Sequence, residues 1–349
     1  MPAPRNDSQV GLVAGAGAPV EVCITVDTEF SIGGAFANPR RYRPLSNELI
    51  ECTIGGRGEG LGFMLGALAE RDIRATFFVE VLQCFYFGDG PMGCLAERIA
   101  AAGHDLQLHL HPAWTCFQSA GWRSQPPQSD SCAALSADEL REMIDFGIDQ
   151  FATWGLAAPI ALRAGNFSCG PSLHRAMTAC GLTLGSNIAL GLRRPADPEL
   201  HLFSMPRWID GVLEIPALTY AALQPPRGSQ LRTLAITATS SREIENLLWQ
   251  ARRDSVTPVV AVTHPFEFVK HDDFRYRELR RDRINQSRFE RLLDFLDRNR
   301  SDFTVTTFGR SGNRWAAAPR QPDHLLRAPA HLAIARRAVN VLNTLAWYY

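Results

Sequence analysis

Several signals are missing from this chain of 349 residues. It has no stretch of about 18 consecutive apolar residues, so the sequence predicts no membrane span. Residues 1–19 lack the basic start and continuous apolar block of a secretory signal, and we expect a flexible N-terminus and a cytoplasmic location. No Walker loop and no G-x-G-x-x-G follows a strand pattern, so a nucleotide cofactor has no support.

The chain also has no net charge at pH 7, because 36 basic side chains balance 36 acidic ones. The chain therefore has no global field that would attract nucleic acid, and we expect no nucleic-acid partner. The eight cysteines form no C-x-x-C pair, and Cys23 lies within an apolar run. They are predicted to be reduced and to behave as small hydrophobic residues. The sequence does not determine the oligomeric state.

What the sequence does contain is a regular alternation of strand and helix patterns. Strands are predicted at 20–26, 74–79, 105–111, 157–164, 182–188, 212–219, 233–237, 258–263 and 303–308. Helices are predicted at 60–71, 91–102, 137–154, 171–180, 241–252 and 285–298. Roughly seven or eight βα units of this kind predict an α/β barrel or a doubly wound sheet.

The remaining segments are predicted to be connections or extensions. Residues 114–134 and 270–284 have the composition of solvated surface loops. The pattern changes after residue 312, where 316–323 resembles a linker and 325–347 an amphipathic helix. We expect that helix to dock on the domain or on a partner rather than to contact a membrane. The predicted organisation is therefore a tail at 1–19, one domain at 20–312, and a linker with a helical extension at 313–349.

The most informative stretch is the predicted strand that ends in His109-Leu110-His111-Pro112. Side chains alternate along a strand, so its leucines share one face and its two histidines share the other. Pro112 has no amide donor and ends the ladder, which places His111 at the carboxyl end of the strand. The two imidazoles are positioned to bind one divalent ion. The alternative is a pair of partly buried histidines with hydrogen-bonded rings.

Polar groups follow three other predicted strands as well. Asp27 and Glu29 follow the first strand, Arg163 lies at the end of another, and His264 follows the strand at 258–263. A barrel gathers such strand ends around one mouth. Two imidazoles and a carboxylate leave an open position on a metal ion, as in hydrolytic sites, and the remaining carboxylate, arginine and histidine can serve as base, orienting group and acid. The alternative for the two carboxylates is a solvated loop start.

At this point the sequence resembles the polysaccharide deacetylase family, the NodB-homology carbohydrate esterases. The resemblance covers residues 20–310 and rests on motifs in order: Thr25-Val26-Asp27-Thr28-Glu29, Ala75-Thr76-Phe77-Phe78-Val79, Gly103-His104-Asp105 through His111, Arg163-Ala164-Gly165, and Thr263-His264-Pro265. It implies a distorted (β/α)7-type barrel. It also implies that Asp27 is the general base, Arg163 its partner, His264 the general acid and His109 a metal ligand.

Two positions depart from the family pattern. The family places a second, metal-binding aspartate where this chain has Thr28, so we predict that Glu29 takes the ligand role. The alternative is that Asp27 binds the metal and Glu29 is the base. The family also spaces its histidines at i and i+4, where this chain has Ala113, so we predict His111 as the second histidine ligand.

The resemblance implies a metal-dependent hydrolase that removes an N- or O-linked acetyl group from a saccharide. The predicted cofactor is a divalent ion, Zn in the first instance, with Co, Ni or Fe as alternatives. Trp114 and Trp208 are candidates for stacking on sugar rings. Two alternative functions remain open: cleavage of a non-sugar amide, as in allantoinase-like and formamide-cleaving relatives, and noncatalytic saccharide binding.

Overall fold

The computed structural model describes residues 18–124, 129–224 and 226–345. Its centre is a curled sheet in the order β12-β1-β4-β5-β6-β7-β9-β8, with β15 also paired to β1. The strands of this sheet are β1 (Val20–Thr28), β4 (Thr76–Glu80), β5 (Asp105–Leu110), β6 (Ala161–Ala164), β7 (Leu184–Gly185), β8 (Arg207–Ile209), β9 (Val212–Glu214), β12 (Val259–Thr263) and β15 (Phe303–Val305). All neighbours are parallel except β8 and β9.

The sheet closes through irregular backbone that follows β9. The Ile215 amide donates to the Gly185 carbonyl in β7, and the Leu218 amide donates to the Val260 carbonyl in β12. The segment after β9 therefore links the β7 side of the sheet to β12, and the strands enclose a common interior. The predicted distorted (β/α)7-type barrel is confirmed.

Side-chain alternation separates the barrel interior from the layer beneath the helices. In β1, Val22, Ile24 and Val26 belong to the large core between strands and helices. A second, smaller core fills the interior with residues from six strands: Cys23, Phe78, Ala161, Leu184, Leu213, Val260 and Val262. Further along the same inward-facing rows, toward the carboxyl ends, stand Asp27, Glu80, His109 and Arg163, all buried. The interior thus changes from apolar to polar along the strand direction.

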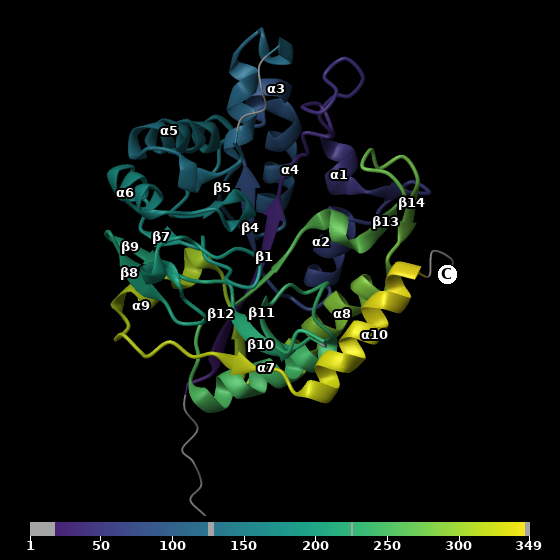
Figure 1. Ribbon diagram of the computed structural model, residues 1–349, viewed down its shortest axis with the longest axis vertical. Helices are drawn as coiled ribbons and strands as arrows, with labels where there is room; N and C mark the ends of the chain where they lie inside the picture. Colours follow the sequence, from purple (N-terminus) through teal and green to yellow (C-terminus); the bar gives the residue numbers. More distant parts are fainter. Residues whose placement is uncertain (1–17, 125–128, 225, 346–349) are drawn as a thin grey trace, which may run out of the picture.

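Helices lie around the outside of the strands (Figure 1). They are α1 (Asn47–Glu51), α2 (Leu61–Ala69), α3 (Cys84–Phe87), α4 (Gly90–Ala101), α5 (Ala137–Thr153), α6 (Pro171–Ala179), α7 (Ser241–Asp254), α8 (Arg283–Arg298), α9 (Phe308–Ala317) and α10 (Ala330–Leu345). A capping box at Ser136 and Glu139 begins α5, and a second one at Ser240 and Glu243 begins α7. Each box satisfies amide groups that the first helical turn leaves unpaired.

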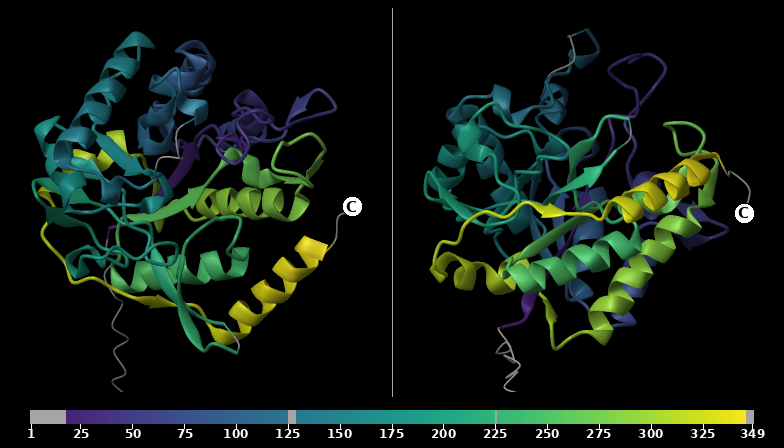
Figure 2. Two further views of the ribbon diagram at one scale, coloured as in Figure 1. Left: turned by 45° about the horizontal axis from the view of Figure 1, so that its top comes forward. Right: turned by 60° about the horizontal axis from the view of Figure 1, so that its bottom comes forward.

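Three small sheets lie outside the barrel. Their strands are β10 (Thr219–Leu223), β11 (Ser229–Thr233) and β16 (Leu326–Arg327) in the first, β13 (Val269–His271) and β14 (Leu279–Arg281) in the second, and β2 (Thr53–Ile54) and β3 (Arg57–Gly58) in the third. Figure 2 shows β10 and β16 beside α10 at the periphery of the molecule. The predicted strand at 233–237 does not form as a strand: β11 ends at Thr233, and beyond it Ala235 makes an isolated parallel bridge to Val262 of β12.

The structure corrects several predictions about connecting segments. The prediction of a solvated loop at 114–134 is wrong for residues 114–124, where two 3₁₀ turns, Pro112–Gln118 and Trp122–Ser124, bury Trp114, Phe117 and Trp122. The loop at 270–284 contains most of the β13–β14 hairpin. Helix α9 runs through the predicted boundary at 312 and into the predicted linker. Phe308 and Trp315 of α9 pack on the barrel interior, because both are aromatic and need a buried surface.

Other expectations concern features of the whole chain. All eight cysteines are free thiols, as predicted. Within the described ranges, no helix is long and apolar enough to cross a lipid bilayer. The predicted flexible tail at 1–19 lies, except for its last two residues, outside the described residues.

Candidate metal centre

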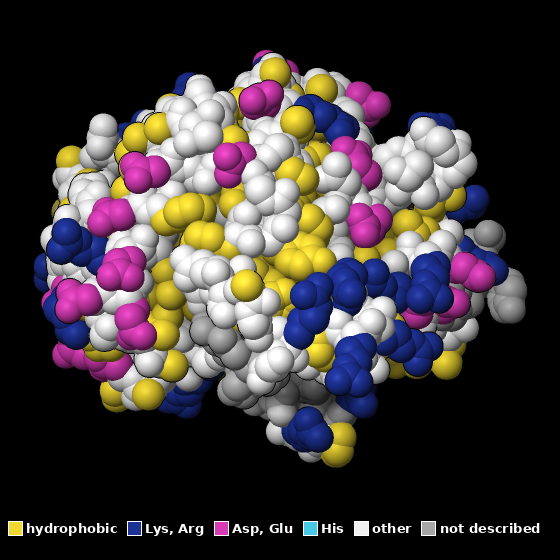
Figure 3. Space-filling view, turned by 90° about the horizontal axis from the view of Figure 1, so that it is seen from above, with side chains coloured by type: hydrophobic (Ala, Val, Ile, Leu, Met, Phe, Trp, Pro, Cys, Tyr) yellow, Lys and Arg dark blue, Asp and Glu magenta, His cyan; other side chains and the backbone are white. Residues whose placement is uncertain are grey.

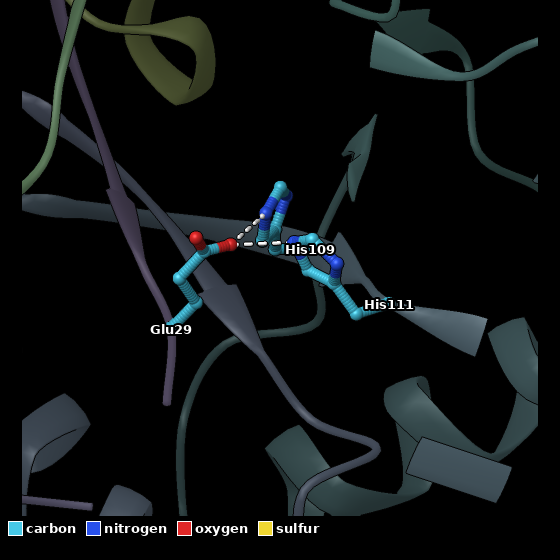
Figure 4. Close-up of side chains that lie close together, drawn as sticks. All are labelled: Glu29, His109 and His111. Atoms are coloured by element: carbon cyan, nitrogen blue, oxygen red, sulfur yellow. Dashed lines mark hydrogen bonds and ion pairs between the residues drawn. The ribbon is translucent and has the colours of Figure 1, made fainter. Parts of the chain in front are cut away.

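Glu29, His109 and His111 meet at the carboxyl end of the barrel (Figure 4). Glu29 directly follows β1, His109 lies in β5, and His111 follows β5 in extended conformation before Pro112. Glu29 Oε2 lies 3.0 Å from His109 Nε2 and 2.5 Å from His111 Nε2. One ligand atom from each residue lies within 4.8 Å of the others, which is compact enough for a single ion. Glu29 and His109, which are 80 residues apart in the sequence, are thus in direct contact.

The far side of each imidazole is held by a second group. His109 Nδ1 donates to the Arg163 carbonyl oxygen at 2.9 Å, and His111 Nδ1 donates to Asp130 Oδ2 at 2.7 Å. Such partners fix the ring orientation and make the other nitrogen a better metal ligand. Because both Nδ1 atoms donate, a proton or a metal ion must stand between each Nε2 and Glu29. The donor set of two imidazoles and one carboxylate fits a divalent ion of the Zn type.

The charges of this cluster support one another. Burial alone would raise the pKa of Glu29, but the adjacent His111 and His109 hold it well below its usual value. Burial would lower the pKa of His111, yet the Glu29 and Asp130 carboxylates raise it well above its usual range. The side chains are therefore arranged to keep the Glu29 carboxylate anionic and to place positive charge beside it, which a metal ion also supplies.

Asp27 lies in β1, two residues before Glu29, and makes separate contacts. Arg163, fully buried, donates from Nη1 to Asp27 Oδ1 at 2.6 Å. The rest of the guanidinium bonds to the carbonyl and hydroxyl of Ser186 and stacks over the Phe78 ring, with its carbon 4.1 Å from the ring centre. Because the guanidinium is fixed on Oδ1, Asp27 Oδ2 is the carboxylate oxygen that is not engaged by Arg163.

His264 faces both carboxylates from the end of β12. Its Nε2 lies 3.8 Å from Asp27 Oδ2 and 4.0 Å from Glu29 Oε1, and its Nδ1 bonds to Glu267 Oε1 at 3.1 Å. Burial would lower the pKa of His264, but Glu267 and the nearby carboxylates raise it to about 9. Glu267 is itself fixed by the hydroxyls of Thr237 and Thr263. The imidazole is thus oriented and favoured in its protonated form.

A cavity of about 350 Å³ connects this cluster to the surface. Its walls are formed by the reactive side chains and by three residues nearer the surface, Asn166, Leu192 and Arg193. Leu192 is 61 % exposed, so it lies at the mouth. Figure 3 shows the face toward which β1 points: apolar side chains gather near its middle, and Lys and Arg side chains gather to one side.

Comparison of the sequence with protein-family models and with curated proteins found no match. Solved structures with a similar chain course are polysaccharide deacetylases and family 4 carbohydrate esterases, the group that the ordered motifs resemble. A protein of Mycobacterium smegmatis assigned as a polysaccharide deacetylase has 16% identity and a TM-score of 0.49, over 90% of this chain and 98% of its own.

Two esterases are less similar. The family 4 carbohydrate esterase of Streptomyces lividans, solved with acetate, has 12% identity and a TM-score of 0.40, over 83% of this chain and 93% of its own. The family 4 acetyl xylan esterase of Clostridium thermocellum, solved with a cobalt ion, has 12% identity and a TM-score of 0.42, over 86% and 93%. At these values the function has to be argued from the site itself.

The structure brings together six residues that the sequence singled out: Asp27, Glu29, His109, His111, Arg163 and His264. The two tryptophans proposed for sugar stacking are not among them. Trp114 is 1% exposed and packs against Phe117 and Phe87, so it presents no ring face to a ligand. Trp208 lies in β8 and lines a different cavity beside Pro19 and Glu21, near the start of β1. The prediction for Trp114 is wrong because apolar packing buries its ring, and the prediction for Trp208 is wrong because β8 places it beside the start of β1, away from the site.

Three carboxylates at the site were missed. Asp130 gave no signal, because it lies in a segment read as a surface loop. Glu267 stands three residues after His264, a spacing that a short helical turn folds into contact. Glu80, fully buried at the end of β4, accepts amide bonds from Leu82 and Gln83. Burial raises the pKa of Glu80 to about 8, and its alternation with Phe78 on the inward row was a usable signal.

Proposed function

We propose that this protein is a metal-dependent hydrolase that removes an acyl group, in the first instance acetyl, from a saccharide. The observation that carries the proposal is the placement of a carboxylate–bis-imidazole cluster next to the Asp27–Arg163 pair and His264, at one end of a barrel. A hydrolytic site needs a way to activate water, a base and an acid within reach of one bond. These groups, from four separate strand ends, line one cavity or lie directly behind its wall.

Glu29, His109 and His111 would hold the metal ion. The ion, when bound, polarises an acyl oxygen and lowers the pKa of water. The alternative in which Asp27 is the ligand and Glu29 the base is less well supported. Glu29 contacts both imidazoles, whereas the nearest basic group to Asp27 is Arg163 at 2.6 Å. The Arg163 guanidinium is a cation and not a metal ligand, and it already occupies Asp27 Oδ1, so it would compete with a metal ion for that oxygen.

Asp27 would act as general base through Oδ2. Arg163 occupies Oδ1, so Oδ2 is the oxygen of Asp27 that can take a proton from the water molecule as the water oxygen attacks the acyl carbon. Water thereby loses a proton to Asp27 and forms the new carbon–oxygen bond. The negative charge that develops on the acyl oxygen lies beside the cationic groups of the cluster.

His264 would act as general acid through Nε2. Glu267 binds the opposite nitrogen, which orients the ring toward the space between Asp27 and Glu29. When the bond between the acyl carbon and the leaving nitrogen or oxygen breaks, that atom takes the proton of His264 and departs as an amine or an alcohol. The products are a carboxylic acid and the deacylated saccharide; Asp27 then returns its proton to the solvent and His264 takes one from the solvent, which restores both groups.

The metal proposal is tested by comparing two conservative variants. Asp27→Asn is expected to keep one equivalent of metal while losing activity by about 10²–10⁴-fold, because only the base is removed. Glu29→Gln is expected to lose metal as well as activity, because a ligand is removed. Elemental analysis of the purified proteins measures the metal content, and release of acetate measures the activity. If Asp27→Asn loses the metal and Glu29→Gln keeps it, the two roles are exchanged.

The substrate is tested with a panel of N-acetylated chitooligosaccharides, O-acetylated sugars and small amides. Release of acetate from the saccharides supports the proposal. Turnover of the small amides alone favours the amide-cleaving alternative. Saccharide binding by a metal-free protein with no acid release favours the noncatalytic alternative.

A further inference from the structure

Helix α10 is turned with its polar side inward and its apolar side outward. Its inward face carries Ala333, Arg336, Asn340 and Asn343, at spacings of three or four residues. Arg336 is 5% exposed and pairs with the fully buried Glu243 of α7 at 3.0 Å. Asn340 accepts a hydrogen bond from Arg288 of α8 at 2.6 Å, and Asn343 donates one at 2.8 Å to Asp282, the N-cap residue of α8. The helix is therefore held to the barrel by polar contacts.

The outward face of α10 carries most of the exposed large apolar side chains among the described residues. Eight large apolar side chains are exposed among the described residues, and five of them belong to this helix: Ile334 (52%), Val339 (38%), Val341 (50%), Leu342 (62%) and Leu345 (74%). Four of these five, Ile334, Val341, Leu342 and Leu345, lie on one stripe of the helix, at successive spacings of seven, one and three residues. A contiguous apolar stripe of this kind on an outer surface indicates an interaction site.

A basic hollow adjoins the same helix. A surface cavity of about 350 Å³ is lined by Arg57, Lys270, Arg280, Arg281 and Arg283, with only Ile54 and Gly55 besides them. Lys270 Nζ donates to the Asn343 carbonyl of α10 at 2.6 Å, which joins the cavity to the helix. Arg281 also pairs with Glu59 at 2.7 Å. In a chain without net charge, five cations around one hollow form a local field that favours anions.

The helix itself adds the chemistry of a membrane interface. Its sixteen residues include His331, Arg336 and Arg337 but neither aspartate nor glutamate. The sequence continues with Trp347, Tyr348 and Tyr349, residue types that favour the boundary between lipid headgroups and acyl chains. Figure 1 and the left view of Figure 2 show α10 at the periphery of the molecule.

We propose that α10 is an interfacial helix that binds the surface of a bilayer containing anionic lipid, with its apolar stripe in the headgroup boundary and the adjoining basic hollow on the lipid phosphates. Apolar burial and attraction to anionic headgroups add in such helices, and neither is strong alone. A second copy of the chain or a protein partner would also cover apolar surface. Neither explains the basic hollow beside the stripe and the absence of acidic residues from the helix. The proposal does not depend on the hydrolase activity proposed above.

The test is sedimentation of the full chain with vesicles of phosphatidylcholine alone, or with about 30 mol% phosphatidylglycerol added. The wild type is expected to bind the anionic vesicles at least about tenfold more strongly than the neutral ones. Leu342→Gln/Leu345→Gln is expected to weaken that binding by about tenfold or more, because two side chains lose their apolar contact with lipid. Arg57→Gln/Arg283→Gln is expected to weaken binding to anionic vesicles only.

The matched control for charge is Arg141→Gln/Arg175→Gln. It removes two exposed cations from α5 and α6, which lie on another side of the molecule, and it is expected to bind as the wild type does. Thermal unfolding of every variant checks that the fold is kept. The proposal is overturned if the wild type stays in the supernatant with both vesicle types, or if the leucine variant binds as strongly as the wild type. It is also overturned if light scattering finds a dimer that the leucine variant converts to a monomer, because a second copy then covers the stripe. Binding needs no turnover, so its result is independent of any failure to release acetate.

Discussion

Buried histidines in this protein differ in the groups that face their ring nitrogens. His109 and His111 each face a carboxylate on one side and a hydrogen-bond acceptor on the other. His104, at the start of the strand that carries them, is 8% exposed and accepts the Ala75 amide proton through Nδ1 at 3.2 Å. That bond requires a neutral nitrogen. Burial and the nearby Arg74 lower the pKa of His104 to about 4.

The lowered pKa of His104 predicts a specific acid sensitivity. The unfolded chain takes up a proton at about pH 6.5 and the folded protein only near pH 4, so stability is full above pH 6.5 and falls as the pH decreases through that window. His104 should account for a loss of about 2 kcal/mol between pH 7 and pH 5. His104→Asn keeps a hydrogen-bond acceptor that does not titrate. Between pH 7 and pH 5 this variant should therefore lose about 2 kcal/mol less of its free energy of unfolding than the wild type does. Urea unfolding of both proteins at the two pH values measures the difference; equal losses would contradict the prediction.

At the scale of the element, the turn after β6 brings backbone unusually close to the metal cluster. Gly165 begins a short 3₁₀ turn, and the next two residues, Asn166 and Phe167, have positive φ values of 54° and 49°. A Cβ added at Gly165 would lie 2.5 Å from the imidazole of His111. Backbone in such conformations is costly and persists where the surroundings demand it. The turn therefore sets the position of one proposed ligand.

Gly165→Ala is expected to push the His111 ring away from Glu29. The contact at 2.5 Å would be lost, and metal affinity should fall by about 10–100-fold, as when a supporting group of a ligand is removed. Competition with a chromophoric chelator measures the affinity. Gly66→Ala in α2 is the matched control, because a Cβ there meets nothing within 4 Å and alanine favours helix. Unchanged affinity in Gly165→Ala would show that the ring has room to adjust.

At the scale of the whole molecule, the C-terminal segment is tied to the barrel by charge. Asp323 accepts from the amides of Phe203, Ser204 and Met205, and β16 pairs with β10. Further along, Arg336 and Glu243 form an ion pair with 6% and 0% of their side chains exposed. An isolated charge at such a site is far more costly than the pair. Residues 323–345 are thus an integrated part of the folded domain.

Glu243→Ala is expected to lower the free energy of unfolding by about 3–5 kcal/mol, because it leaves the Arg336 guanidinium buried without its counter-ion and removes a capping box from α7. Chemical denaturation gives the value. The control is Glu290→Ala, which removes an exposed carboxylate from the neighbouring α8 and should change stability by no more than about 0.5 kcal/mol. A similar small change in both variants would contradict the inward orientation of Arg336.

Strand patterns predicted the site better than the loops did. Alternation in 105–111 placed both histidines on one face, and the four strand ends with polar residues meet as predicted. Local composition misjudged 114–134, because its serine, glutamine and proline content hid three aromatic rings that the fold buries. It also hid Asp130, whose contact with His111 depends on how that segment folds back. Helix α9 was read as the end of a strand and a linker, since its aromatic residues find their partners only inside the barrel.

The main alternation of strands and helices and the residues at the four strand ends of the site were determined by the sequence alone, because a period of two or 3.6 residues is a local property of the chain. Which of two carboxylates touches the histidines was decided by the tertiary structure: the buried Arg163, brought in from β6, occupies Asp27 and leaves Glu29 to the imidazoles. The outward turn of α10 was decided in the same way. Its apolar stripe is visible in the sequence, but Glu243 and Asp282 hold its polar face against the barrel.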